Sequence, residues 1–129
     1  MAQRKIFGER NQSLSNMLLE GKTYYDWVVT TAFYSSIHFV EDYLFPVKIN
    51  GKDCENIFEV KRAYNMEGRH AARERVVFEK MNYEIGARYK WLDDHSRNAR
   101  YKTYKLQPAE ALKAQEYLNY IHNFCYPKE

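Results

Sequence analysis

Apolar residues recur every three or four positions over most of the chain, which is the spacing of one face of an α-helix. The clearest case is segment 24–45, whose apolar and small positions form one wide stripe: Tyr25, Val28, Val29, Ala32, Phe33, Ser36, Ile37, Val40 and Leu44. Pro46 follows this stripe, and a proline favours an extended conformation in the residue before it. The pattern therefore predicts a central helix that ends just before Pro46.

Two shorter helical patterns flank this segment. A first helix is expected over 10–22, with Gly21 as its stop. After the central helix, segment 68–81 resumes the helical spacing, and its inner side is formed by Ala72, Val76, Val77 and Met81. Both segments are rich in residues that favour helices.

The C-terminal half of the chain predicts two longer helices. One covers about 83–103, with Asn82 as its expected N-cap and an inner stripe of Ile85, Tyr89, Leu92, Ser96 and Ala99. The last takes Pro108 as its first helical residue after Gln107, has Glu110 in its first turn and ends before Pro127. Its stripe consists of Ala111, Ala114, Leu118, Ile121 and Cys125.

Between Pro46 and Met66 the helical pattern dissolves. This segment contains a turn-like Asn50-Gly51 pair and room for one short helical piece. We expect a long loop here, and no alternating strand-like run elsewhere. The predicted fold is a single all-α domain over 1–129, an antiparallel bundle of four to five helices.

Composition narrows the class of protein further. A chain of 129 residues suits one domain, and its two cysteines, Cys54 and Cys125, lie in no metal-ligand or redox spacing. No apolar segment resembles a leader or a membrane span, so we expect a cytoplasmic protein without membrane contact. The net charge of +3 is too small to indicate nucleic-acid binding by itself. Whether the chain binds nucleic acid therefore depends on where its positive charges lie.

The densest candidate chemistry lies in segment 93–104. Arg97, Tyr101 and Tyr104 are four and seven positions apart, so on a helix they would share a face, with Arg100 beside it. An arginine next to tyrosines can hold a phosphate and stack a base. In the alternative interpretation Arg97 pairs with Asp93 or Asp94, and the tyrosines cap the bundle.

Histidines offer a second kind of candidate. Arg88 and His95 are seven positions apart, with Trp91 and Lys102 near the same line, and a histidine beside an arginine can perform acid–base chemistry on a phosphodiester. His38 could be oriented by Asp42 or be a satisfied core or interface histidine, and His70 could contact acidic residues of a neighbour. The sequence contains no metal-binding spacing, Gly-rich phosphate loop or GxSxG motif, and predicts neither a metal nor a cofactor.

Three segments together resemble a known family. They are "YYDWVVTTAFYSSIHFVEDYL", "GRHAARERV" and "YKWLDDHSRNARYKTY", followed by a final amphipathic helix. In this order they resemble the HEPN superfamily (higher eukaryotes and prokaryotes nucleotide-binding) from about residue 10 to 125. The small residues Ser35, Ser36, Ser96 and Ala99 would then pack the bundle and build a dimer seam.

The resemblance implies a homodimer and, in many members, metal-independent RNA cleavage by an arginine, a polar residue and a histidine four to six positions on. Arg97 and Asn98 match the first two positions. Lys102, Thr103 and Tyr104 occupy the positions where the histidine would stand, and lysine and tyrosine are poor bases at neutral pH because their pKa values lie near 10.4 and 10. Some related members end the motif in a tyrosine, as Tyr104 does, and pair with a nucleotidyltransferase.

Two functions follow from these patterns. The first is binding of RNA or a nucleotide through a basic-aromatic face, with ribonuclease activity left open by the missing histidine. Its binding residues would be Arg88, Arg97, Asn98, Arg100 and Tyr101, and its catalytic candidates Arg97, His95, Lys102 and Tyr104, with His70 as a substitute. The alternative is a non-catalytic module that binds a protein encoded nearby, for example in a toxin–antitoxin or nucleotidyltransferase system.

Overall fold

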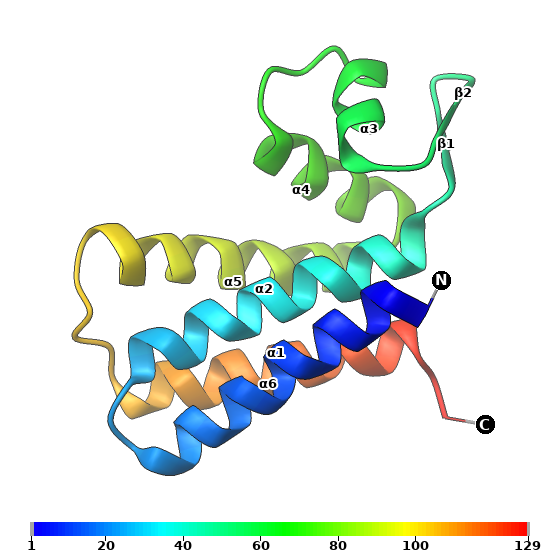
Figure 1. Cartoon of the computed structure of the whole chain (residues 1–129). Helices are drawn as coiled ribbons and strands as arrows, with labels where there is room; N and C mark the ends of the chain where they lie inside the picture. Colours follow the sequence, from blue (N-terminus) through cyan, green and yellow to red (C-terminus); the bar gives the residue numbers. More distant parts are fainter. Residues whose placement is uncertain (1, 129) are drawn as a thin grey trace.

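The computed structural model of the chain describes residues 2–128. These residues form six helices and one short β-hairpin (Figure 1). In chain order the elements are α1 (Ala2–Gly21), α2 (Tyr25–Leu44), β1 (Val47–Ile49), β2 (Lys52–Cys54), α3 (Ile57–Ala63), α4 (Arg69–Lys80), α5 (Tyr83–Tyr101) and α6 (Pro108–Cys125). The all-α class is confirmed, although the helices outnumber the four or five that the sequence predicts.

Helix α2 is the centre of the bundle. It packs against α1, α5 and α6, while α3, α4 and the hairpin lie together at one end (Figure 1). The predicted stripe of α2 does face the core: Val28, Val29, Ala32, Phe33 and Val40 are fully buried. Burial of the valine and phenylalanine side chains contributes about 1.5–3 kcal/mol each, so this helix carries much of the driving force for folding.

Helix α1 begins at Ala2 and not near residue 10, so the prediction for its start was wrong. Gly8 explains part of the difference, since a Cβ on Gly8 would lie 2.5 Å from the ring of Phe39. The missing side chain lets α1 approach α2, and the hydroxyl of Ser35 donates a 2.6 Å hydrogen bond to the Gly8 carbonyl. Gly21 does end the helix, although Lys22 is the residue that takes the left-handed conformation (φ 56°).

In segment 46–66 the expected turn at Asn50-Gly51 and the expected short helical piece, α3, are both present, but two short strands stand where only a loop was expected. The antiparallel strands β1 and β2 flank Asn50 and Gly51, whose φ angles of 49° and 79° suit a tight hairpin turn. Ile49 and Cys54 are buried at the two strands' inner side, together with Val60 of α3. The hairpin and α3 thus extend the core above the end of α2.

The predicted ends of the later helices are mostly confirmed. The side chain of Asn82 accepts a 2.8 Å hydrogen bond from the Ile85 amide, and the Gln107 amide donates to Glu110 at 2.9 Å. Helix α5, however, ends at Tyr101, because the amides of Lys102 and Thr103 both donate to the Asn98 carbonyl. Tyr104 therefore lies outside the helix, and the prediction that it continues the helical face of Arg97 was wrong.

The small residues expected at a dimer seam are buried inside the single chain. Ser35, Ser36 and Ser96 are inaccessible, and Ala99 is nearly so. Their role in packing the bundle is confirmed, but they are not available to a second copy. No helix within 2–128 has the length and apolar character that crossing a membrane requires.

Candidate functional site

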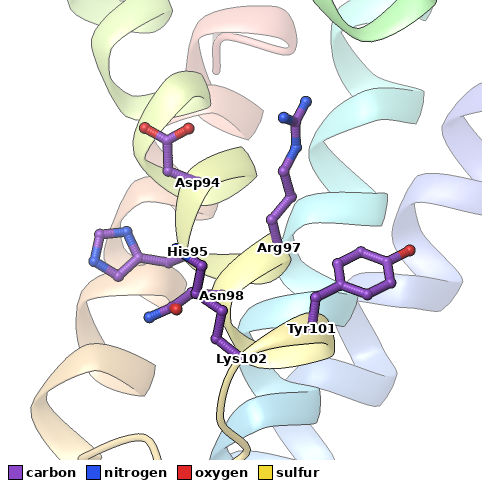
Figure 2. Close-up of a pocket in the computed structure, with 6 residues that line it drawn as sticks. All are labelled: Asp94, His95, Arg97, Asn98, Tyr101 and Lys102. Atoms are coloured by element: carbon purple, nitrogen blue, oxygen red, sulfur yellow. The ribbon is translucent and has the colours of Figure 1, made fainter.

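The C-terminal half of α5 exposes two neighbouring rows of polar side chains (Figure 2). Asp94, Arg97 and Tyr101 form one row, and His95, Asn98 and Lys102 form the other. All six line one open depression of about 610 Å³. The structure thus brings together most of the residues singled out from the sequence, although they come from one helix and its C-cap.

Arg97 is paired with an acidic neighbour. Its Nε lies 3.1 Å from Oδ1 of Asp93, and its Nη2 lies 3.3 Å from Oδ2. The Asp93 side chain is only 2% exposed, whereas that of Arg97 is 49% exposed. Asp94 is engaged elsewhere, by Lys90 at 3.1 Å. The alternative in which Arg97 pairs with Asp93 is therefore what the structure shows, and half of the guanidinium side chain still faces solvent.

The His95 side chain packs against its own helix, α5, on a different side from Arg97. Its ring stacks on Trp91 with centroids 3.7 Å apart, and its Nδ1 lies 2.9 Å from the Trp91 carbonyl. A carbonyl only accepts hydrogen bonds, so Nδ1 carries the proton and Nε2 is left as the acceptor. Figure 2 shows the imidazole of His95 and the guanidinium of Arg97 extending to different sides of the helix. The two groups do not converge on one phosphodiester.

Arg88 belongs to the side of the bundle that faces α6. Its guanidinium carbon lies 3.8 Å from the ring centroid of Tyr120 and 5.3 Å from that of Tyr117, and it pairs with Glu84 at 3.1 Å. Trp91 also contacts Tyr117, edge to face at 5.3 Å. Arg88 and His95 are thus linked through aromatic residues, away from Arg97.

Arg100 is less exposed than Arg97, and its neighbours are aromatic and polar. Its guanidinium lies 5.6 Å from the ring of Tyr34 and 5.3 Å from that of Tyr101, and it donates to the Ser96 hydroxyl at 3.1 Å. Among residues 2–128 no carboxylate lies within 4.0 Å of it. Within the described residues the charge of Arg100 is therefore not balanced by a carboxylate, and its guanidinium lies beside two exposed aromatic rings.

A second cavity, which sequence reasoning missed, lies between the start of α2 and the end of α5. Its volume is about 350 Å³, and its lining consists of Asp26, Trp27, Thr30, Ala99, Arg100 and Tyr104. Trp27 is 51% exposed. The signal was available, because Trp27 lies off the apolar stripe of its helix, where a large aromatic residue has no role in the core.

Two other histidines lie near charged groups. His70 lies in the first turn of α4, and its pKa is lowered by partial burial and then by the positive charge of Arg73, which Asp93 opposes and to which Arg97 adds. Burial likewise lowers the pKa of His38, which the carboxylate of Glu41 opposes. Within residues 2–128 Asp42 makes no hydrogen bond to His38; its carboxylate accepts a 2.5 Å hydrogen bond from the Tyr126 hydroxyl. Of these two histidines, His70 is thus the one whose pKa is affected by the charge of Arg97.

In the described part of the chain, no three acidic, histidine or cysteine side chains are grouped so that they could hold a metal ion. Comparison with known proteins gave no match to a protein family, a curated protein or a solved structure. Function must therefore be inferred from the site itself.

Proposed function

We propose that this protein binds RNA through a basic-aromatic face at the end of α5. We use this name for the surface formed by Tyr34, Arg97, Asn98, Arg100, Tyr101, Lys102 and Tyr104. The observation that carries the proposal is Arg100, a cation without a carboxylate partner within the described residues, which lies between two partly exposed tyrosine rings.

The chemistry of this face suits a flexible polyanion. Arginine donors bind phosphate oxygens, and exposed aromatic rings stack unpaired bases, worth about 1–3 kcal/mol for each base. Tyr101 and Tyr104 are 78% and 69% exposed, so their rings are open to stacking by a base. Lys102 caps the same helix and adds a further positive charge. The sequence resemblance to HEPN domains supports the same class of ligand.

The geometry argues against a ribonuclease centre within one chain. Cleavage by the 2′-hydroxyl requires a base and a phosphate-binding group on the same phosphodiester. His95 and Arg97 extend to different sides of α5 (Figure 2), so they do not meet at one phosphodiester. We therefore propose binding without cleavage as the function of the single chain.

A second candidate function rests on a different surface. Helix α1 exposes four large apolar side chains, Ile6, Phe7, Leu14 and Met17. Such side chains on one helix favour contact with protein, either a second copy of the chain or a separate partner. A size measurement by light scattering, with Met17→Lys as the disrupting variant, would distinguish a dimer from a monomer.

Fluorescence anisotropy with a labelled mixed-sequence RNA tests the proposed function. Arg100→Ala should weaken binding and reduce the slope of log affinity against log salt by about 0.7, because one phosphate contact to a single strand is lost. Arg62→Ala is a matched control, since Arg62 is exposed on α3 and has no ion pair within residues 2–128. Equal affinity and slope for the wild type and Arg100→Ala would refute the proposal.

A further inference from the structure

The cavity at the start of α2 is built from two parts of the chain that are far apart in sequence. The first turns of α2 supply Asp26, Trp27 and Thr30, while Arg100 and Tyr104 come from the end of α5 and the loop after it. It shares Arg100 and Tyr104 with the basic-aromatic face. A ligand held by that face could therefore extend into this cavity.

The size and walls of the cavity suit a flat aromatic ligand. Its volume of about 350 Å³ is at the lower end of the range for small-molecule sites, about 300–1,000 Å³. The Trp27 side chain, about half exposed, offers an indole surface, and the phenol of Tyr104 is more exposed still. Indole and phenol rings are the groups on which proteins stack unpaired bases.

The lining of the cavity also includes one positive and one negative side chain. Arg100 contributes a cation, whereas Asp26 contributes a carboxylate, and the two form no ion pair although both line the same space. Within residues 2–128, no side chain or amide donates a hydrogen bond to the Asp26 carboxylate. Two acceptor oxygens therefore stand available opposite a phosphate-binding group.

We propose that this cavity holds one unpaired base of the bound RNA, stacked on Trp27, with its donor edge on Asp26 and its phosphate on Arg100. The inference rests on the proposed function and names the substrate class more closely, as single-stranded RNA.

The carboxylate also selects among bases. Guanine presents two adjacent donors, N1–H and the N2 amino group, which match the two oxygens of Asp26. Uracil presents one donor between two carbonyl oxygens, and these oxygens repel a carboxylate. The cavity therefore prefers guanine to uracil.

Trp27 provides a direct reporter of occupancy. The chain has two tryptophans, so Trp91→Phe leaves Trp27 as the single emitter. This variant would be titrated with two hexanucleotides that differ only in one central base, guanine or uracil, and followed by both tryptophan fluorescence and anisotropy of a labelled RNA. We expect quenching of Trp27 and about tenfold tighter binding of the guanine oligomer, the discrimination of one bidentate base contact.

Asp26→Asn in the same background should lose the preference, because the amide replaces one acceptor oxygen with a donor. Tyr104→Ala, in an exposed loop where folding is not at stake, should weaken binding of both oligomers. RNA binding without quenching of Trp27, or a guanine preference that survives Asp26→Asn, would overturn the base site and leave the proposed function intact. Absence of RNA binding to every variant and to the wild type would overturn both.

Discussion

The buried carboxylate of Asp93 holds the guanidinium of Arg97 through two contacts of 3.1 and 3.3 Å. The contact joins residues one turn apart on α5, and its acidic partner is almost inaccessible to water. Arg97 is therefore required by the fold as well as available to a ligand. Loss of RNA binding in an Arg97 variant would not by itself identify a phosphate contact, so Arg100 is the better residue to test.

Arg97→Ala should lower the free energy of unfolding by about 1–3 kcal/mol, because the Asp93 carboxylate is left buried without its partner. Arg100→Ala should change it by less than about 1 kcal/mol, since no carboxylate depends on Arg100. Urea unfolding of the two variants measures the difference. Adding Asp93→Asn to Arg97→Ala should restore part of the loss, and a double variant no more stable than Arg97→Ala would contradict this role.

The Tyr89 hydroxyl is buried and makes no hydrogen bond within the described structure. Burial raises the pKa of this phenol far above its ordinary value, although the nearby positive charge of Arg73 opposes the shift, so the group stays neutral. Tyr89→Phe removes a polar atom that has no partner, and we expect the melting temperature to stay unchanged or rise. A clear loss of stability, as measured by thermal unfolding, would show that the hydroxyl has a partner in solution.

Arg73 joins α4 to the central helix through a 2.8 Å contact between its Nε and Oε2 of Glu41. Both side chains are largely buried, so Arg73→Ala should cost about 3–5 kcal/mol by leaving Glu41 uncompensated. Arg75→Ala, two positions along the same helix, removes an exposed pair with Glu79 and should cost about 1 kcal/mol or less. Equal losses in urea unfolding would contradict the difference in burial.

Stability should fall when the pH drops below about 6.5. Burial lowers the pKa of His38 in the folded chain, with Arg73 and Arg4 adding to this and Glu41 opposing it. The unfolded chain then binds protons that the folded chain does not, so the free energy of unfolding decreases as the pH falls from the ordinary value of 6.5. Urea unfolding at several pH values between about 7.5 and 5.5 checks this. His38→Gln should flatten part of the dependence, and an unchanged dependence would exclude His38 as a cause.

Sequence patterns predicted the fold well where a structural feature depends on residues close together in the sequence. The stripe of α2, the Asn82 cap and the Pro108 start each depend on local spacing or local hydrogen bonds, and each is confirmed. Segment 2–9 was missed because its residues show no apolar stripe of their own. Its helix depends on the close approach of Gly8 to Phe39, which is a tertiary contact. The hairpin around Asn50-Gly51 was missed because its strands are only three residues long.

The candidate site was predictable only in part. Helical spacing placed Arg97 and Tyr101 correctly in one row, but could not decide whether Arg97 was free or paired. It also could not bring Trp27 and Asp26 to the end of α5, since these residues lie about seventy positions earlier and meet it only through the packing of α2. That Arg100 has no carboxylate partner is likewise a property of the folded chain.

The most direct test of RNA binding by the basic-aromatic face is to map the RNA-binding surface of the wild-type protein, without choosing variants in advance. Amide chemical shifts of isotope-labelled protein would be recorded during titration with a short unstructured RNA. We predict that the largest changes cluster at 97–104 and at 26–34, where the face and the adjoining cavity lie. Changes confined to α1 or to the surface around Arg88 and Tyr120, or no changes at all, would contradict the proposed function.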